Sequence, residues 1–255
     1  MHSVNHHVLA DRALAAASKA LATRFPKSAF AFVAGSIMRG EGTTSSDIDL
    51  VVVFPHVDTA WRESFMEDGF PVETFVQDPQ TLAYFFENDL KSGCPVMIHM
   101  VASGEIIGPE VERAKAVQSR AAQALARGPL PLSKSDYDVL RYKVSDLADD
   151  LRGDRPPAEV RAIAAQIYQQ LADLTLLGRG RWTGRGKWVS RLLENLDRDL
   201  ASTFDDAFQR AAQGDGAALL AVADAELALH GGHCFAGYNH RAPPDARCVV
   251  QDWVS

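Results

Sequence analysis

The sequence has few cysteines, no long apolar run and no excess of positive charge, and each absence excludes a class of protein. Its three cysteines, Cys94, Cys234 and Cys248, are an odd number without CxxC spacing. This pattern favours reduced thiols over a disulfide framework, and it argues against a zinc knuckle. We therefore expect a protein of the cytoplasm.

The apolar stretches and the charge balance set further limits. Even the apolar run Leu50–Phe54 is far too short to span a bilayer, and residues 1–7 lack the cationic segment and apolar core of a signal peptide. The net charge of -7 weighs against nonspecific binding to duplex nucleic acid, which depends on clustered Lys and Arg. It is compatible with a cationic small substrate.

The first half of the chain alternates predicted helices and strands. Apolar residues recur at nearly helical spacing from Val8 to Phe25, and Pro26 closes this helix. A second helix is predicted at residues 79–92, whereas residues 61–69 have a mixed pattern. His99 falls in the last of four predicted strands, which cover residues 29–36, 47–54, 70–77 and 95–102. This alternation is typical of an α/β domain.

The second half has a different period. Apolar residues step by three or four along 137–151 and 160–174, and two more helices are predicted at 186–210 and 216–230. Residues 127–133 contain two prolines and are typical of a linker. We expect an α/β (α+β) domain with a mixed sheet at residues 1–127, followed by an all-α helical bundle domain at residues 134–255.

Two aspartates stand where a buried strand begins. In a strand, Asp47 and Asp49 share one face, with Cα atoms about 6.5 Å apart. Two carboxylates held this close repel each other unless a cation lies between them. Mg²⁺ prefers a few carboxylates together with phosphate oxygens and water. The pair is therefore a candidate metal clamp.

The stretch before the aspartates and a later strand supply further candidates. Gly35 lets the backbone approach a ligand, and Ser36 offers a hydroxyl; a helix starting after Gly35 would favour a polyphosphate. Arg39 and Ser46 lie in the same loop. Either they contact phosphate or metal-bound water, or they are ordinary surface residues. Glu73 would be a third carboxylate if a neighbouring strand brings it alongside the pair.

A plain structural alternative exists for each of these residues. Asp, Ser, Thr and Gly are common in turns, so "SSDID" is also compatible with solvated charges that open a strand. Glu73 is likewise compatible with a charge at a strand edge. The composite of glycine, serine, aspartate pair and third acid favours the functional interpretation over the structural one.

This composite resembles a known family. GS at Gly35 and Ser36, ten residues, D-I-D at Asp47 and Asp49, and then Glu73 within an apolar strand resemble the nucleotidyltransferase fold shared with DNA polymerase β. The resemblance covers residues 28–102. It implies transfer of a nucleoside monophosphate from a triphosphate such as ATP, with two Mg²⁺ ions. Asp47, Asp49 and Glu73 would hold the metals, and Glu73 is alternatively the base.

A glycine-rich, cationic turn between two predicted helices, residues 177–193, extends this resemblance. It contains no Walker A motif, because Arg181 and Trp188 stand where that motif needs Gly and Ser or Thr. The turn is similar to one in the streptomycin and spectinomycin adenylyltransferases, where a lysine reaches toward the triphosphate. Lys187 matches that lysine. The alternative is a glycine-capped helix end with solvated arginines.

Two other clusters in the second half have simpler explanations. The aspartates of "SDLADD", Asp146, Asp149 and Asp150, are compatible with a patch for a polyamine-like acceptor, but a solvated helix face is the simpler interpretation. The tail "HGGHCFAGYNH" offers four residues with metal-ligating side chains, although their spacing fits no zinc pattern. These four residues are His230, His233, Cys234 and His240.

Three hypotheses for function follow. The leading one is a nucleotidyltransferase that moves AMP from ATP to a hydroxyl of a small acceptor, with no membrane or duplex nucleic acid as partner. An aminoglycoside-like molecule is one candidate for this acceptor. The second keeps this chemistry but makes a protein the acceptor. The third is a noncatalytic nucleotide-binding protein or antitoxin-type partner on the same fold, and three mutually repelling carboxylates argue against it.

Overall fold

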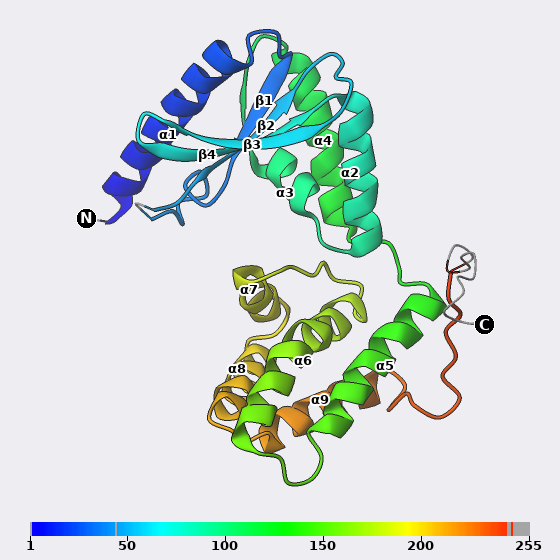
Figure 1. Ribbon diagram of the computed structural model, residues 1–255. Coiled ribbons are helices and arrows are strands. Elements are labelled where there is room, and N and C mark those ends of the chain that lie inside the picture. The colour runs from blue at the N-terminus through cyan, green and yellow to red at the C-terminus, as the bar shows by residue number, and fades with distance from the viewer. Residues whose placement is uncertain (1, 44, 244–245, 247–255) are drawn as a thin grey trace, which may run out of the picture. The chain divides into compact units, whose positions relative to one another are not determined.

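The computed structural model describes residues 2–43, 45–243 and 246 and divides into two compact units, Met1–Leu130 and Pro131–Ser255 (Figure 1). Within these described residues, the first unit contains a five-stranded sheet and four helices, and the second contains helices. The expectation of an α/β domain with a mixed sheet followed by a helical domain is confirmed. Within the described ranges, no helix combines the length and the apolar character that crossing a membrane requires.

The sheet of the first unit has the strand order β3-β4-β2-β1-β5. β2 and β4 run parallel, whereas the other neighbouring strands are antiparallel. This pairing places the starts of β2 and β4 next to each other. The strands are β1 (Phe30–Ala34), β2 (Ile48–Val53), β3 (Trp61–Glu67), β4 (Phe70–Gln77) and β5 (Glu105–Ile107).

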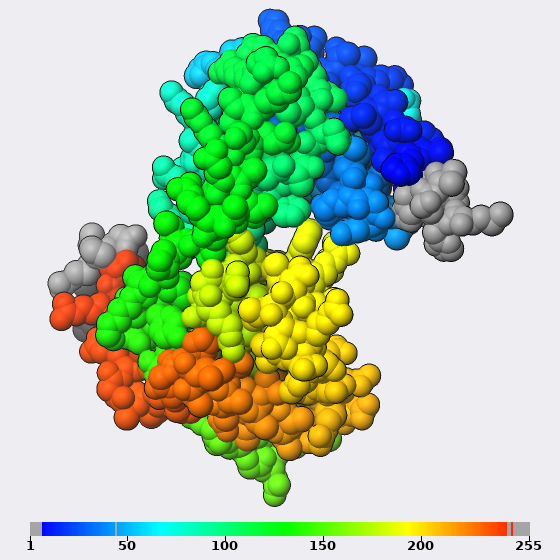
Figure 2. All heavy atoms as spheres, turned by 180° about the vertical axis from the view of Figure 1, so that it is seen from behind, coloured from blue at the N-terminus to red at the C-terminus, as the bar shows by residue number. Residues whose placement is uncertain are grey.

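Helices cover both faces of this sheet. α1 (His2–Arg24) packs on one face, where its alanines meet Leu50 and Val52 of β2. α2 (Pro79–Ser92), α3 (Val96–Ser103) and α4 (Val111–Arg127) lie on the other face (Figure 1). Seen from behind, α4 forms much of the surface of this unit (Figure 2). Because β2 is covered on both sides, it is a nearly continuous apolar run after its aspartate.

The prediction of a strand at residues 95–102 is wrong, since α3 occupies this segment. The buried residues Met97, Ile98, Met100 and Val101 have the one-, three- and four-residue spacing of a helix face. A short apolar run does not distinguish a buried strand from a buried helix. His99 is therefore a half-buried helical residue. The segment with a mixed pattern instead forms β3, an edge strand whose residues alternate in exposure.

The second unit is a set of helices around one apolar core. Among the described residues of this unit, the core is formed by buried residues of five helices, from Leu140 on the first to Leu227 on the last. The helices are α5 (Lys134–Asp150), α6 (Pro157–Leu177), α7 (Lys187–Leu196), α8 (Arg198–Ala212) and α9 (Ala217–Leu229).

The prediction of one helix at residues 186–210 is wrong, because α7 ends and α8 begins at Asp197. Asp197 is extended, with φ of -163°, and its carboxylate accepts the backbone N–H groups of Asp199 at 2.9 Å and Leu200 at 3.0 Å. Aspartate is a strong helix N-cap, and this bonding satisfies donors that a new helix leaves open. The apolar period continues across the break, so the pattern alone did not reveal it.

Candidate active site

Asp47, Asp49 and Glu73 converge at one end of the sheet; we call them the acidic trio. Asp49 lies directly opposite Glu73 in the parallel register of β2 and β4, and Asp47 comes two residues before Asp49. Each residue offers one carboxylate oxygen, and these three oxygens lie within 4.8 Å of one another. Asp47 is exposed, and the other two are half-buried. Among the described residues, no other group of acids, histidines or cysteines is arranged in this way.

The apolar pattern of β2 decides which face carries the trio. Ile48 and Leu50 point toward α1 and are fully buried, so Asp49 points to the opposite face. Farther along β2, Val51 and Val53 are also buried. Asp49 remains accessible, because cover on this face is incomplete where β2 begins. The trio is thus both fixed by a buried strand and open to a ligand.

Gly35 packs its backbone against the carboxylate of Asp49. Ala34, at the end of β1, pairs with Asp49 on β2, and Gly35 follows with φ of +101°. A Cβ atom at this position would lie 3.1 Å from Oδ2 of Asp49. Only glycine combines this left-handed backbone with such close approach at little cost. Gly35 therefore shapes the trio directly.

The segment after Gly35 is a turn, so the condition for a helix N-terminus at this position is not fulfilled. Backbone hydrogen bonds close the turn locally. The N–H of Gly40 donates to the carbonyl oxygen of Ile37 at 3.0 Å, and the N–H of Glu41 donates to the carbonyl oxygen of Ser36 at 2.9 Å. Gly42 follows, where a Cβ would clash with Ile37 at 2.7 Å. The turn is consequently compact, but it lacks the aligned N–H groups of a helix terminus.

Ser36 and Ser46 join the two ends of this loop. The Ser36 hydroxyl donates to Oγ of Ser46 at 3.1 Å, and the backbone N–H of Thr43 donates to the same oxygen at 2.9 Å. Nε of Arg39 lies 3.4 Å from a carboxylate oxygen of Glu41. These contacts give both serines a role in the shape of the loop.

Two residues beside the site were missed by sequence reasoning. His99 of α3 lies near the loop: burial lowers its pKa, and the charge of Arg39 lowers it further while that of Glu41 opposes the shift. Arg62 of β3 donates from Nε to Oε1 of Glu73 at 2.9 Å, and its Nη2 contacts the same oxygen. Both were missed because the segments around them were assigned the wrong structure or none.

The chemistry of the trio fits a hard divalent cation. All three ligands are carboxylates, which suit Mg²⁺ or Mn²⁺, whereas zinc prefers nitrogen and sulfur ligands. Three neighbouring negative charges are also unfavourable without a cation between them. Asp47, Asp49 and Glu73 are therefore the residues that could hold Mg²⁺ in this unit.

In the second unit, the cationic turn before α7 is held by a buried aspartate. Asp173 of α6 accepts from the Thr183 hydroxyl at 2.6 Å and from Nη1 of Arg185 at 2.8 Å. Lys187 and Arg181 are exposed, and within the described ranges no side-chain partner is found for either. Arg185 is thus fixed by Asp173, whereas Lys187 and Arg181 are left for solvent or a ligand.

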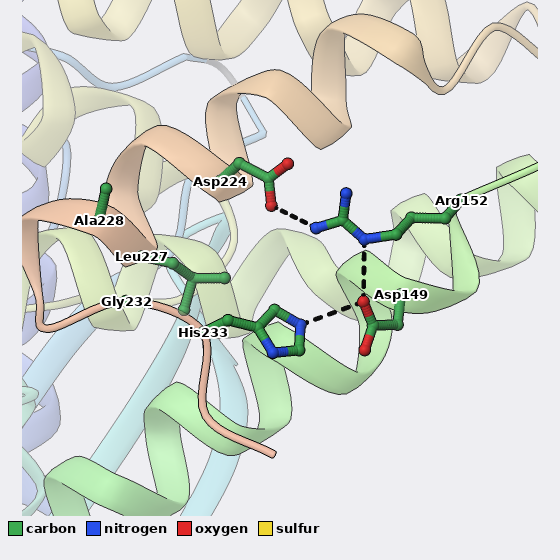
Figure 3. Close-up of a pocket in the computed structure, with 7 residues that line it drawn as sticks. All are labelled: Asp149, Arg152, Asp224, Leu227, Ala228, Gly232 and His233. Carbon is green, nitrogen blue, oxygen red and sulfur yellow. Dashed lines mark hydrogen bonds and ion pairs between the residues drawn. The ribbon is translucent and has the colours of Figure 1, made fainter. Parts of the chain in front are cut away.

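The candidate acidic patch of α5 is largely paired within its own unit. Asp149 accepts from Nε of Arg152 at 2.9 Å and lies 3.1 Å from Nε2 of His233. Arg152 also donates to Asp224 of α9 at 2.7 Å. These residues line a pocket of about 420 Å³, and their side chains point toward one another across it (Figure 3). Asp150 pairs with Arg155 at 3.6 Å.

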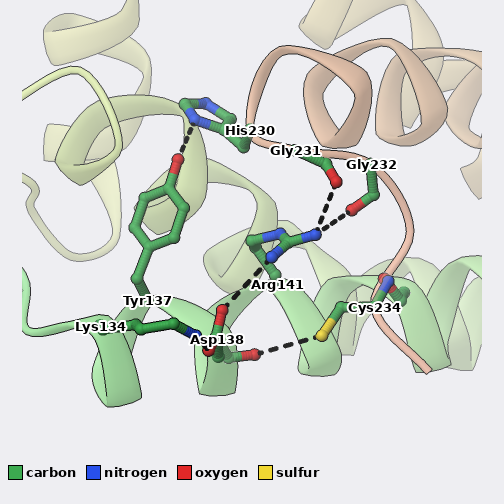
Figure 4. A network of polar contacts seen from close by, with 9 residues as sticks. Lys134, Tyr137, Asp138, Arg141, His230, Gly231, Gly232 and Cys234 are labelled. Atoms are coloured by element: carbon green, nitrogen blue, oxygen red, sulfur yellow. Dashed lines mark hydrogen bonds and ion pairs between the residues drawn. The ribbon is translucent and has the colours of Figure 1, made fainter. Parts of the chain in front are cut away.

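The histidines and cysteine of the tail make separate structural contacts. Nδ1 of His230 lies 2.6 Å from the hydroxyl of Tyr137, and Sγ of Cys234 donates to the backbone carbonyl of Asp138 at 3.9 Å (Figure 4). Arg141 binds the backbone carbonyls that follow His230. This network attaches the tail to α5. Cys94 and Cys234 are both thiols, and Cys248 lies outside the described residues.

A comparison with known protein families agrees with this geometry. Residues 14–122 match the family model described as nucleotidyltransferase domain, and this match includes the whole acidic trio. A nucleotidyltransferase-like protein from Exiguobacterium sibiricum 255-15 has a similar solved structure, with 12% identity and a TM-score of 0.44, covering 84% of this chain and 76% of that one. No curated protein matches the sequence. Residues 14–122 of the first unit are thus similar to nucleotidyltransferase domains.

Proposed function

We propose that the protein is a Mg²⁺-dependent nucleotidyltransferase that moves AMP from ATP to a hydroxyl of a small-molecule acceptor. The domain match supports nucleotide transfer in general. The observation that carries the proposal is the acidic trio, whose carboxylate oxygens lie within 4.8 Å of one another beside the Gly35 turn. A strand-borne cluster of this kind suits in-line transfer at a phosphoryl group.

Asp47 and Asp49 would hold the divalent cations, for which we propose two Mg²⁺ ions. When bound, Mg²⁺ stabilises negative charge on the phosphate oxygens and positions the reacting groups. The protein contributes positioning to this chemistry, because Asp49 is held in the buried strand β2 and Asp47 directly precedes that strand. Their rigid placement reduces the reorganisation that binding would otherwise require.

Glu73 would complete the metal site or accept the proton of the attacking hydroxyl. A general base must lie within hydrogen-bond reach of that proton. The variant Glu73→Gln separates the two roles. If Glu73 is a ligand, the variant binds Mn²⁺ more weakly; if it is only the base, Mn²⁺ binding is retained and kcat falls by about 10²-fold or more.

The Gly35 turn and two cationic residues would bind the triphosphate. Backbone groups at Gly35 approach the trio closely, and Ser36, Arg39 and Ser46 belong to the same loop. Lys187 is exposed and carries a positive charge, so we include it as a phosphate-binding residue. An ATP donor and an acceptor of aminoglycoside-like chemistry are the first to test, and the net charge of -7 is compatible with a cationic acceptor.

The decisive experiment is binding of labelled ATP with Mg²⁺ to the wild type, Asp47→Asn and Asp49→Asn. We expect both variants to lose metal-dependent binding. Asp58→Asn is the matched control, because the Asp58 side chain is fully exposed and lies outside the trio. Unchanged binding in both trio variants would overturn the assignment. Mass spectrometry for an AMP adduct then separates small-molecule acceptors from protein acceptors, and absence of pyrophosphate release with every acceptor favours a noncatalytic binding protein.

A further inference from the structure

Arg62 makes an ion pair with one member of the acidic trio from the neighbouring strand. Both its Nε and its Nη2 contact Oε1 of Glu73, with Nε at 2.9 Å. Among the described residues, Arg62 is the only partner in a hydrogen bond or ion pair with the Glu73 side chain. The side chain of Glu73 is 22% exposed and that of Arg62 is 61% exposed. The guanidinium is therefore accessible and lies directly against the candidate metal ligand.

A second contact confines the guanidinium. Cζ of Arg62 lies 5.0 Å from the centroid of the Phe75 ring, within the range of a cation–π interaction. In the antiparallel register, Arg62 is opposite Phe75, and Phe75 is two residues from Glu73. All three side chains consequently leave the same face of the sheet. Arg62 is held between an aromatic ring and the carboxylate.

The position of Arg62 has an electrostatic consequence for the trio. An exposed cross-strand ion pair contributes little to folding stability, so the pair of Arg62 and Glu73 stabilises the sheet only weakly. A guanidinium next to a ligand carboxylate, however, repels any dication that binds there. The same positive charge attracts a polyanionic phosphate chain.

We propose that Arg62 is the counter-ion of Glu73 and that divalent cations bind the trio in competition with it. This inference rests on the proposed function, in which Glu73 is a metal ligand. It means that a free metal ion binds weakly, whereas the metal together with a triphosphate binds well, because the phosphates offset the charge of Arg62. Arg62 thereby makes metal binding depend on the nucleotide.

Mn²⁺ titration followed by the electron paramagnetic resonance signal of free Mn²⁺ tests this without any activity assay. The proteins are the wild type, Arg62→Met, Glu73→Gln and the double variant, since methionine keeps an apolar stem against Phe75 and removes the charge. We expect Arg62→Met to lower the Kd for Mn²⁺ roughly three- to tenfold. The same substitution should have a smaller effect in the Glu73→Gln background, because only the direct repulsion between Arg62 and the metal ion is then removed. A nonhydrolysable ATP analogue should improve Mn²⁺ affinity more in the wild type than in Arg62→Met.

Arg24→Met is the matched control. Cζ of Arg24 lies 3.9 Å from the centroid of the Phe65 ring, so this variant removes a similar cation–π contact and the same charge. Phe65 packs with the α1 core on the opposite face from Glu73. We expect no change in Mn²⁺ affinity, because the trio is on the other side of the sheet.

Three results would overturn the inference: an unchanged or weaker Mn²⁺ affinity in Arg62→Met, an equal gain in Arg24→Met, or a gain of undiminished size in the Glu73→Gln background. If Asp47→Asn and Asp49→Asn lose Mn²⁺ while Arg62→Met changes nothing, this inference alone fails. If the wild type binds no Mn²⁺ with or without the ATP analogue, the proposed metal site fails and this inference fails with it.

Discussion

Asp49 on β2 and Glu73 on β4 are direct partners in the parallel register of the sheet, so their side chains leave one face as neighbours. Strand β3 and its connections separate them along the chain. The candidate site therefore depends on strand pairing as much as on the aspartate motif. Substitutions that disturb this pairing, or the backbone beside it, should affect the site even when they leave the carboxylates in place.

Gly35→Ala should weaken Mn²⁺ binding and destabilise the first unit by about 1–2 kcal/mol. Alanine is unfavourable at a φ of +101°, and its Cβ would lie 3.1 Å from Oδ2 of Asp49. Gly69→Ala is the control: its φ is +86°, but no atom lies within 4 Å of the added Cβ. It should lose similar stability in urea unfolding and keep Mn²⁺ binding. Equal Mn²⁺ affinity in the two variants would contradict the role given to Gly35.

Asp89→Asn should change how stability depends on pH. Burial raises the pKa of Asp89 from 3.8 to about 6. Hydrogen bonds from the backbone N–H groups of Ile98, Met97 and Val96 lower this pKa but do not cancel the effect of burial. The folded state therefore holds the proton more tightly than the unfolded chain. Its contribution is fully present below pH 3.8 and is lost as the pH rises through about 6. In Asp89→Asn this loss, about 2–3 kcal/mol at most, should be absent.

Urea unfolding at pH 4, 5, 6 and 7 measures this difference. We expect Asp89→Asn to gain stability relative to the wild type as the pH increases across this window. Asp58→Asn, which changes a fully exposed aspartate, serves as the control. A pH profile of Asp89→Asn parallel to that of the wild type would show that the buried carboxyl does not titrate as stated.

Arg179→Met should destabilise the second unit by about 2–3 kcal/mol. Nη1 of Arg179 lies 2.6 Å from a carboxylate oxygen of Glu226, whose side chain is only 4% exposed. Removing the arginine leaves a buried carboxylate without this cation, which is more costly than losing an exposed pair. Arg181→Met, two residues along the same turn and exposed, should unfold like the wild type in a thermal scan. Similar melting temperatures for the two variants would refute this prediction.

Lys187→Met should raise the Kd for ATP roughly tenfold, because a charge-assisted contact to phosphate is lost. Lys187 is exposed at the start of α7, so its replacement should leave the melting temperature unchanged. Lys134→Met is the control, since Lys134 starts another helix of this unit and pairs locally with Asp138. Isothermal titration with ATP and Mg²⁺ gives the measurement. An unchanged Kd in Lys187→Met would remove this residue from the proposed site.

Segments with a clear period and a cap were predictable from the sequence. β4 and α2 begin and end where the pattern placed them, at Phe70–Gln77 and Pro79–Ser92. Asp78, between them, accepts the backbone N–H groups of Gln80 and Thr81, both at 2.9 Å. The helix-capping residue and the apolar period therefore indicate the same boundary. A prediction is reliable where such local signals agree with each other and with the overall fold.

The segments predicted wrongly are those whose structure depends on distant neighbours. Residues 95–102 carry an apolar run that suits either a buried strand or a buried helix. Residues 61–67 occupy the edge next to β4, and β5 occupies the edge next to β1. Both edges of the sheet are thus taken by other segments, and α3 packs on its face instead. Competition for sheet positions is a property of the whole fold.

The sequence by itself determined that Asp49 leaves β2 on the face opposite Ile48 and Leu50, because side-chain direction in a strand alternates residue by residue. It also determined the helical character of the second half through the three- and four-residue apolar period. Only the tertiary structure decided that Glu73 lies beside Asp49 and that Arg62 pairs with Glu73. The physical reason is that these contacts join separate strands, and no local period encodes which strands pair or in which register.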